Sequence, residues 1–449
     1  MKKQITEETV LLISVIKWSV LATVVGVLSG LATAVFILSL NWSTSHLGRL
    51  SHFYLLLPVA FFASAFITKY LAPEAEGHGT EKVIEAIHRR AAKIKAAVVP
   101  VKICTTIITL AAGGSAGKEG PCAQIGGGLS SILADIFKFN PADRRKLVIC
   151  GISAGFASVF GTPIAGAVFG IEVLFVGTIL YDVLLPSFIA GIIGYQVSSS
   201  MGVSYFYHPI DFVPSFSEAY FIKVLFGAIF IGLCSFVFIE SMNYFKRLSE
   251  KIKIWYPWKG VIGGVAIVLL VFIFSPKYLG LGLDPIEATL QGGVGSWYDF
   301  IVKIIFTSIT LNFGGSGGIV TPIFFVGSAF GSVYAHIMGL DTSTFAAIGM
   351  VSLLAGCANT PLAASIMAVE LFGPKIAPYA AVACVVSFLI TGHRSIYPSQ
   401  VFAIMKSSSI RGEIGKEVEE IQTEFQMREH SLISGVLMLV RKVFKRPGL

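Results

Sequence analysis

The sequence predicts an all-α polytopic integral membrane protein that contains an internal duplication, and three observations lead to this fold class. The first is composition: of 449 residues, 54% are hydrophobic and only 13% are charged, which is about half the charged fraction of a typical soluble domain. The second is that many apolar segments are interrupted by glycine or proline. The third is that two glycine-rich motifs recur at a spacing of about 200 residues.

Several apolar segments are long enough to cross a bilayer, which takes about 20 apolar residues in a helix. Examples are 11–40, 219–239 and 261–274 with its flanks. Other segments are broken into apolar pieces of about ten to fifteen residues, too short to span the membrane alone. Because irregular backbone survives at membrane depth only where protein covers it or where it lines a cavity, the breaks predict re-entrant helices around an internal pathway.

The net charge of +8 is explained by membrane topology rather than by nucleic acid binding. Lys and Arg gather between apolar segments, as they do in cytoplasmic loops, whereas the loops at 201–217 and 276–299 carry four Asp or Glu against the single Lys277. We therefore expect these two loops outside, both termini in the cytoplasm, and the protein in the cell membrane. The basic residues concerned are Arg89, Arg90, Lys93, Lys95, Arg144, Arg145, Lys146, Lys246, Arg247, Lys251, Lys253, Arg441, Lys442, Lys445 and Arg446.

The domain organisation follows from the same patterns. We expect a short cytoplasmic segment at 1–9, one membrane domain at 10–405, and a short cytoplasmic tail at 406–449 without a large regulatory domain.

The six cysteines lie in or beside apolar segments and form no CxxC pair, so we interpret them as small buried residues rather than as a disulfide framework or a zinc site. No metal, nucleotide or organic cofactor is implied.

The duplication is visible in two pairs of motifs. GGSAGKEGP at 113–121 aligns with GGSGGIVTP at 314–322, and GTPIAGAVFGIE at 161–172 aligns with NTPLAASIMAVE at 359–370. The halves lie near 75–200 and 276–391. Basic residues lead into the first glycine motif, whereas acidic residues lead towards the second, and this charge pattern favours inverted halves. Paired segments interrupted by Gly or Pro are the sequence feature that best indicates the substrate site of a transporter.

Glycine-rich helix starts of this kind suit an anion. Backbone N–H groups at a helix N-terminus are unpaired, and the helix dipole adds partial positive charge there. Glycine lets an anion approach the backbone closely. Two such helix starts meeting near the midplane would hold a small anion without a fixed cationic side chain, which suits a pathway that the ion must also leave.

The repeats differ at one position, where the first has Glu119 and the second has Val320. A carboxylate at membrane depth costs about 2.5–3.5 kcal/mol on insertion scales and is a functional hypothesis by default. Glu119 can occupy the site in place of a transported anion, and its protonation would release it, which makes a pH-sensitive gate. The alternative is a carboxylate that caps its own helix and pairs with Lys118.

Two other readings concern residues in the same motifs. Glu172 and Glu370 occupy equivalent places in the second motif pair, so we interpret both as structural acids that satisfy backbone amides. GGSG at 314–317 also has the GxSG form of an intramembrane serine protease, and His336 is a candidate base. This remote alternative is disfavoured because no His follows Ser115 in the matching region, and a Ser–His pair is defined by geometry.

Taken together, these motifs resemble the CLC family of chloride channels and chloride/proton exchangers over about residues 20–405. GKEGP at 117–121 matches the family's G-K/R-E-G-P signature and implies that Glu119 is the external gate. GGIVTP at 317–322 resembles G-x-F-x-P, with Val320 where the family usually has Phe, and Tyr397 in SIYPSQ matches the Tyr whose hydroxyl reaches the central ion. The resemblance implies a CLC-type inverted-repeat fold, a homodimer, and anion binding by Gly117, Lys118, Gly120, Gly318, Ile319, Val320, Thr321, Tyr397 and the His78 position.

The chain departs from the family pattern at two positions. GHGTE at 77–81 resembles G-S-G-I-P but has His78 where the family's Ser coordinates the ion, which affects the inner gate and anion preference; Thr80 is the candidate to supply a hydroxyl instead. Val173 follows Glu172 where exchangers commonly carry a second Glu that relays protons. We therefore expect passive, channel-like chloride conduction gated by Glu119. The alternative is a proton-coupled chloride/H⁺ antiporter, because water can replace a relay carboxylate and simple prokaryotic members mostly look like exchangers.

Overall fold

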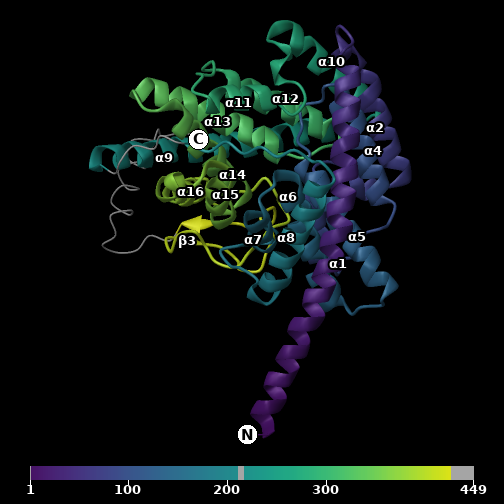
Figure 1. Ribbon diagram of the computed structural model, residues 1–449. Helices are drawn as coiled ribbons and strands as arrows, with labels where there is room; N and C mark the ends of the chain where they lie inside the picture. The colour runs from purple at the N-terminus through teal and green to yellow at the C-terminus, as the bar shows by residue number, and fades with distance from the viewer. Residues whose placement is uncertain (1, 211–216, 426–449) are drawn as a thin grey trace.

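The computed structural model describes residues 2–210 and 217–425, and these are mostly helical (Figure 1). The first half of the chain contains α1 (Lys2–Leu47), α2 (Leu57–Leu71), α3 (Gly79–Arg89), α4 (Val98–Ala111), α5 (Glu119–Ile136), α6 (Pro141–Phe160), α7 (Pro163–Glu172) and α8 (Leu184–Ser200). The second half contains α9 (Glu218–Lys251), α10 (Tyr256–Ile273), α11 (Leu283–Leu290), α12 (Asp299–Asn312), α13 (Val320–Met338), α14 (Thr342–Ala358), α15 (Pro361–Phe372) and α16 (Ala377–Ile390).

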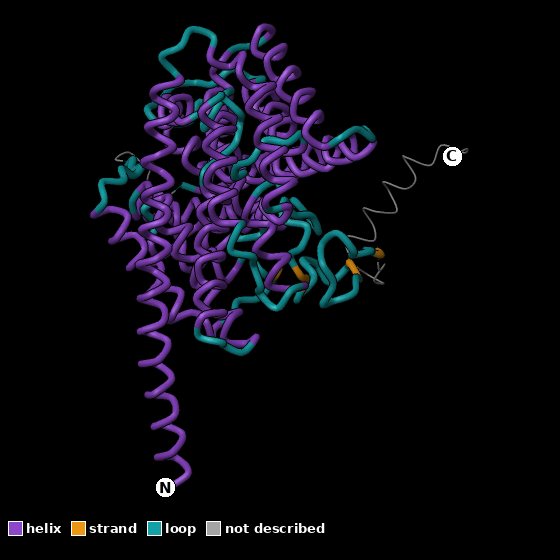
Figure 2. Tube along the Cα trace, turned by 90° about the vertical axis from the view of Figure 1, so that its right-hand side faces the viewer, coloured by secondary structure: helices purple, strands orange, loops and turns teal. Residues whose placement is uncertain are grey.

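The remaining elements are short. Five 3₁₀ turns are η1 (Phe53–Leu56), η2 (Pro73–Ala75), η3 (Tyr181–Val183), η4 (Pro276–Tyr278) and η5 (Pro374–Ile376). Four two-residue strands form two pairs, β1 (Phe175–Val176) parallel to β2 (Val401–Phe402) and β3 (Ile410–Arg411) antiparallel to β4 (Glu424–Phe425). Figure 2 shows how little strand the described chain contains. The predicted all-α class is confirmed.

Six helices in the described residues are long and apolar enough to cross a membrane. They include the three predicted examples, which lie within α1, α9 and α10. Several other helices are too short to span alone, among them α7 with 10 residues and α15 with 12. Pro163 and Pro361 stand at the first position of these two helices, where the missing N–H costs no intrahelical hydrogen bond. The interrupted sequence pattern therefore produces short, protein-covered helices.

The structure shows no break at residue 9, where we expected a cytoplasmic segment to end and the membrane domain to begin. α1 is one helix of 46 residues, about 69 Å long at 1.5 Å per residue, and its N-terminal part projects beyond the rest of the molecule (Figures 1 and 2). The polar start continues the helix because Lys, Gln and Glu are good helix formers and no Gly or Pro occurs before Gly26. Residues 426–449 of the predicted tail lie outside the described residues.

The duplication extends further than the sequence motifs indicate. The order α1, α2, η2 and α3–α8 is repeated as α9, α10, η4 and α11–α16, and α4 and α12 even share a length of 14 residues. The repeats therefore begin at α1 and α9 rather than near 75 and 276. The first two helices of each half carry no glycine motif, so the sequence comparison could not align them.

Reciprocal hydrogen bonds show that an approximate two-fold axis relates the halves. The N–H of Ser115 donates to Thr310 Oγ1 at 3.1 Å, and the N–H of Ser316 donates to Thr109 Oγ1 at 3.0 Å. A two-fold axis of this kind places equivalent elements on opposite faces, as in other inverted-repeat transporters. One face carries η2, whose Glu74 pairs with Arg90 and Lys95.

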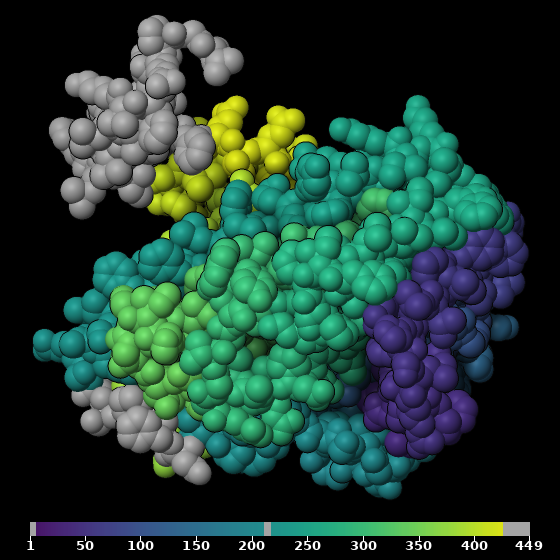
Figure 3. Space-filling model, turned by 90° about the horizontal axis from the view of Figure 1, so that it is seen from above, coloured from purple at the N-terminus to yellow at the C-terminus, as the bar shows by residue number. Residues whose placement is uncertain are grey.

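We call this side of the molecule the basic face, because ion pairs and ring contacts connect its cations into one region. Its members include Lys17, Arg89, Arg90, Lys95, Arg145, Lys146 and Lys246, and the described part of the tail joins it through Glu417 and Glu419. The opposite face carries the end of α1 and the segment around η4, which line one cavity together. Figure 3 views the molecule from this side, where second-half segments in green occupy the middle.

Matched glycines let the broken helices pack closely in both halves. A Cβ on Gly126 of α5 would overlap the carbonyl of Gly151 in α6, and a Cβ on Gly327 of α13 would overlap the carbonyl of Gly349 in α14. Close backbone approach through small residues is the usual way for helices to associate within a membrane. This packing holds the N-terminal ends of α5 and α13 rigidly at the centre of the molecule.

Candidate anion-binding site

Three irregular segments from both halves meet at the centre of the protein. The N–H of Gly117 donates to the Gly318 carbonyl at 2.7 Å, and the N–H of Gly318 donates back to the Gly117 carbonyl at 2.6 Å. His78 forms a parallel bridge with Gly317. These segments lead directly into α3, α5 and α13, so three helix N-termini converge on one point. Their unpaired N–H groups and dipoles give that point a positive potential.

Glu119 is fully buried at this point. Its carboxylate accepts the backbone N–H of Thr321 at 3.2 Å and also the hydroxyl hydrogen of Thr321. The acid of the first repeat therefore occupies the helix N-terminus of the second repeat. The alternative of a carboxylate that caps its own helix does not describe this geometry, because these partners belong to α13 and not to α5.

Glycine is required on both sides of this carboxylate. A Cβ added to Gly318 would lie 2.8 Å from Glu119 Oε2 and 2.7 Å from the backbone nitrogen of Gly120, and one added to Gly117 would overlap the same carboxylate. Neither residue has the positive φ that often demands glycine. Their role is close approach, which lets an anion sit directly against the backbone.

On the side of the site toward the basic face, three buried polar atoms make no aligned hydrogen bond within the described chain. They are His78 Nδ1, the Thr80 hydroxyl and the Tyr397 hydroxyl. The His78 and Tyr397 rings lie 5.6 Å apart, and the two hydroxyls are close enough to interact electrostatically without being aligned. Buried polar groups are normally satisfied, so this convergence marks a place for an ion or water. It includes the predicted Tyr397, His78 and the hydroxyl candidate Thr80.

Two cavities approach the site from opposite sides. A cavity of about 490 Å³ on the basic face is lined by His78 and Glu81, among others. A cavity of about 240 Å³ on the other side reaches Lys118 and Thr321. The segment after α8 borders this second cavity with Tyr205 and is held down by backbone hydrogen bonds to α15. Glu119 lines neither cavity, but its chain neighbour Lys118 and its hydrogen-bond partner Thr321 both line the second one.

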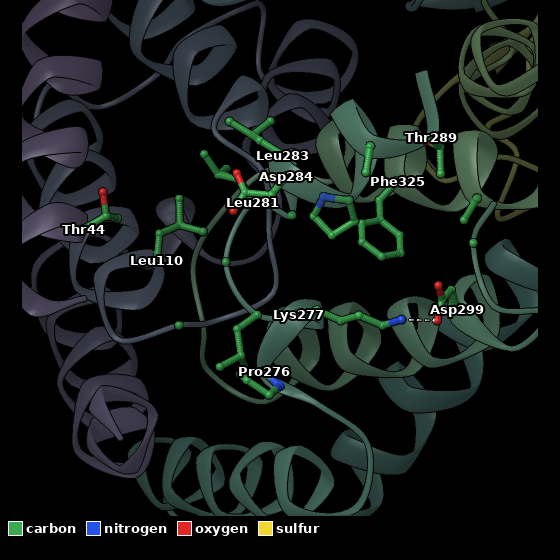
Figure 4. A pocket seen from close by; sticks show the side chains of 18 of the residues that line it. Thr44, Leu110, Pro276, Lys277, Leu281, Leu283, Asp284, Thr289, Asp299 and Phe325 are labelled. Carbon is green, nitrogen blue, oxygen red and sulfur yellow. Dashed lines mark ion pairs between the residues drawn. The ribbon is translucent and has the colours of Figure 1, made fainter. Parts of the chain in front are cut away.

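A third and larger cavity, of about 760 Å³, opens on the opposite face (Figure 4). Its apolar walls include Leu281, Leu283 and Phe325, and Lys277 and Asp299 form an ion pair of 2.8 Å at its edge. It occupies the position that corresponds, by the internal symmetry, to the 490 Å³ cavity. It therefore belongs to the repeat that lacks the central carboxylate.

Val173, at the predicted proton-relay position, is fully buried and immediately follows α7. Its carbonyl accepts a hydrogen bond of 2.8 Å from the Gln400 amide, which also donates to the Ala358 carbonyl at 2.8 Å. An apolar side chain and a neutral amide thus stand where exchangers commonly have an acid. The sequence analysis missed Gln400, although a glutamine three residues after Tyr397, at the end of the membrane domain, was a usable signal.

Glu172 and Glu370 make the same contact in positions that the two-fold axis relates. Glu172 accepts the N–H groups of Leu362 and Ala363 at 3.0 and 2.8 Å. Glu370 accepts those of Ile164 and Ala165 at 3.0 and 2.8 Å. Each acid therefore caps the short helix of the other half, which is the geometry that a structural role requires.

The geometry contradicts the protease alternative. The Ser316 hydroxyl interacts with the hydroxyls of Thr105 and Thr106 at 3.1 and 3.2 Å. His336 lies near the far end of α13, about 24 Å from the start of that helix at 1.5 Å per residue. Ser316 is the symmetry mate of Ser115, whose hydroxyl interacts with Thr307 at 3.0 Å. Both serines hold the glycine loops in place.

The cysteine interpretation needs one correction. All six thiols are free and five are buried, but Cys104 on α4 is exposed. The described chain therefore leaves this side of α4 uncovered. Among residues 2–210 and 217–425, no three His, Cys, Asp or Glu side chains are grouped as a metal site.

Comparison with known proteins agrees with this geometry. A family model described as "Voltage gated chloride channel" matches residues 59–392. The "Chloride/fluoride channel protein" of Pseudomonas syringae pv. tomato is 37% identical over 403 residues, which cover 88% of each chain. The "H(+)/Cl(-) exchange transporter ClcA" of Klebsiella pneumoniae is 29% identical over 382 residues, covering 78% of this chain and 80% of the relative.

The fold itself matches a solved structure. A "CLC-type fluoride/proton antiporter" superposes with a TM-score of 0.81 at 29% identity, covering 86% of this chain and 98% of the other. The family match, the relatives and this likeness agree with the motifs around Glu119 and Tyr397, and they confirm the resemblance drawn from the sequence. The chain is therefore a member of the family of voltage gated chloride channels, the CLC family.

Proposed function

We propose that this protein carries a small halide, fluoride or chloride, across the membrane through the Glu119 site and exchanges it for protons. The observation that carries the proposal is the position of the Glu119 carboxylate, which accepts the Thr321 N–H and hydroxyl where a transported anion would bind. Members of the family are channels and transporters rather than enzymes. The names of the relatives, which include chloride and fluoride carriers with and without proton exchange, support the choice of substrates.

The exchange follows from competition between two anions for one site. While Glu119 is ionised, its charge occupies the N-terminus of α13 and excludes a halide from the same N–H groups. Protonation removes that charge, the carboxyl group leaves, and a halide can take its place. On the other side, the hydroxyls of Thr80 and Tyr397 and the ring of His78 would hold the ion. Hydroxyl and backbone N–H donors suit a small, strongly hydrogen-bonding anion.

Passive conduction, expected from the sequence, is the second candidate, and Val173 favours it. Exchange requires a group that delivers protons from the basic face, and the relay position holds an apolar side chain. In this case Glu119 would serve only as a gate that opens on protonation. The two candidates share the site and differ in whether protons cross the protein.

Orientation and assembly are part of the proposal. We place the basic face toward the cytoplasm because cytoplasmic segments of membrane proteins are enriched in Lys and Arg, and we place the protein in the cell membrane. The family resemblance also implies a homodimer with one pathway in each subunit. Mass measurement of the purified protein in a mild detergent tests the dimer, and a mass of one subunit would contradict it.

Paired flux measurements decide between the two candidates. Purified protein is placed in liposomes that contain potassium fluoride or potassium chloride, and halide and pH electrodes record the weakly buffered external medium. Exchange predicts that halide efflux drives protons inward against their gradient, and that Glu119→Gln keeps halide efflux but loses proton movement. Halide efflux without coupled proton movement would support passive conduction. Absence of fluoride and chloride efflux would contradict both.

A further inference from the structure

We infer that Glu81 is the proton-transfer group on the basic face, and that it takes over the task of the acid missing at Val173. This inference rests on the proposed exchange of halide for protons. Glu81 lies in the first turn of α3 and belongs to the segment that contributes His78 and Thr80 to the candidate site. It is an acid that the gate mechanism does not use.

One side of Glu81 reaches the medium. Its side chain helps to line the cavity of about 490 Å³ that opens on the basic face. The carboxylate also accepts the Ser399 hydroxyl at 2.6 Å and the Ser399 N–H at 3.2 Å. These bonds fix the carboxylate beside the Tyr397 segment, since Ser399 is two residues from Tyr397 in the chain.

The other side of Glu81 faces the centre. The start of α3 packs so closely on α5 that a Cβ on Gly79 would overlap the carbonyl of Gly120, the residue after Glu119. The Tyr397 hydroxyl lies within electrostatic range of both Glu81 and Glu119 and close to the Thr80 hydroxyl. Neither hydroxyl is hydrogen-bonded to a carboxylate of the described chain. Because a hydroxyl both donates and accepts a hydrogen bond, the hydroxyls of Thr80 and Tyr397 can pass a proton between the two carboxylates when water fills the gaps.

In the proposed transfer, one proton passes from Glu81 to Glu119. Protonated Glu81 releases its proton to the Thr80 and Tyr397 hydroxyls, or to water between them, and becomes a carboxylate. Glu119 takes up a proton from the same chain and becomes neutral, which frees it from the N-terminus of α13. Glu81 then regains a proton from the cavity. Glu119 releases its proton into the cavity of about 240 Å³ on the other side when its carboxylate returns to the N-terminus of α13. Halide movement in the opposite sense completes the exchange.

The surroundings allow Glu81 to change its charge near neutral pH. Burial raises the pKa of Glu81 to about 7, although the hydrogen bonds from Ser399 and the charge of Lys82 oppose this rise. A pKa near the working pH is what proton transfer favours. The other charged or titratable groups that line its cavity are His78, Lys82, Glu85 and Arg89 near or on α3, Lys246 and Glu250 on α9, Tyr256 and Lys259 on α10, and Glu76 and Glu419.

A purely structural role for Glu81, in which it only holds the Tyr397 segment, makes different predictions. Ser399→Ala removes a hydrogen bond that lowers the pKa of Glu81, so the proton flux should persist with its pH profile moved to higher pH. If Glu81 were only an anchor, Ser399→Ala would reduce halide flux and leave the pH profile in place. Glu81→Asp, which keeps the acid, should retain part of the proton flux.

The decisive experiment compares proton and halide flux in liposomes for the unmodified protein, Glu81→Gln and the control Glu85→Gln. Glu85 lines the same cavity one turn further along α3. We expect Glu81→Gln to lower proton flux by about tenfold or more, as for loss of a general acid, with halide flux within about twofold, and Glu85→Gln to behave as the unmodified protein.

Two outcomes would overturn the inference. One is unchanged proton flux in Glu81→Gln, and the other is an equal loss in Glu85→Gln. If the unmodified protein moves no protons at all, the proposed exchange itself fails, which is a distinguishable result. Elution volume and melting temperature in detergent identify variants that fail to fold, and Glu81→Asp then supplies the test.

Discussion

The two halves of this protein share a scaffold but differ in the groups that they place at its centre. Equivalent hydrogen bonds join Ser115 to Thr310 and Ser316 to Thr109, so each half makes the same contact with the other. Yet Glu119 in the first half corresponds to Val320 in the second. The difference shows that the two repeats share their backbone arrangement, and that the candidate functional group is at a position where they differ.

The cavities show the same contrast. Lys102 donates to the carbonyls of Ala75 and Gly77, and Lys303 donates to those of Tyr278 and Gly280, which makes Leu281 the counterpart of His78. The cavity beside His78 is lined mainly by polar and charged side chains, whereas the cavity beside Leu281 is mainly apolar and has Asp284, Lys277 and Asp299 among its few charged residues (Figure 4). The two symmetric cavities therefore differ in polarity as well as in the group at the centre.

The largest expected effect comes from removing the central asymmetry. Glu119→Gln takes away the charge that competes with the halide, so proton flux should fall to the level of empty liposomes while halide flux persists and loses its dependence on pH. The measurement is paired electrode recording over a range of external pH. Glu287→Gln is the control, because Glu287 lines the cavity on the same side and should change nothing. Retained proton flux in Glu119→Gln would show that the gate is elsewhere.

Lys102 and Lys303 make equivalent contacts in the two halves, so substituting each tests whether the two halves contribute equally to stability but unequally to transport. Lys102 and Lys303 are both fully buried, and each carbonyl left without its donor costs about 1–3 kcal/mol. Lys102→Met and Lys303→Met should therefore lower the melting temperature in detergent to a similar extent. Only Lys102→Met should also reduce halide flux, because it loosens the segment that leads to His78. An equal loss of flux in both variants would contradict this difference.

The reciprocal acids should behave alike. Glu172→Gln and Glu370→Gln each lose one of two acceptors for backbone N–H groups at the start of a short helix, which costs about 1–3 kcal/mol. Both variants should melt at similarly lowered temperatures and keep their ratio of proton to halide flux. If Glu172→Gln alone lost proton flux, the acid beside Val173 would carry protons and its interpretation as structural would be wrong.

Local patterns made part of this structure predictable. Apolar length predicted α1, α9 and α10, and the glycine motifs placed the starts of α5 and α13 at the centre. Contacts between distant segments left no comparable signal in one sequence: the caps that join Glu172 to Leu362 and Glu370 to Ile164, and the bond between Glu81 and Ser399, appear only after folding. A glycine motif can predict a helix start, but it cannot predict which helix a carboxylate will cap.

The smallest expected effect concerns the attachment of the tail to the first repeat. Arg89, at the end of α3, donates to both Glu417 oxygens at 2.7 and 2.5 Å, but its side chain is 48% exposed. An exposed pair of this kind contributes about 0–1 kcal/mol and is screened by salt. Arg89→Ala should therefore barely change the melting temperature, and less so at high salt. Because α3 also carries Glu81, a clear change in proton flux without a change in stability would mean that the tail adjusts the cavity of the first repeat.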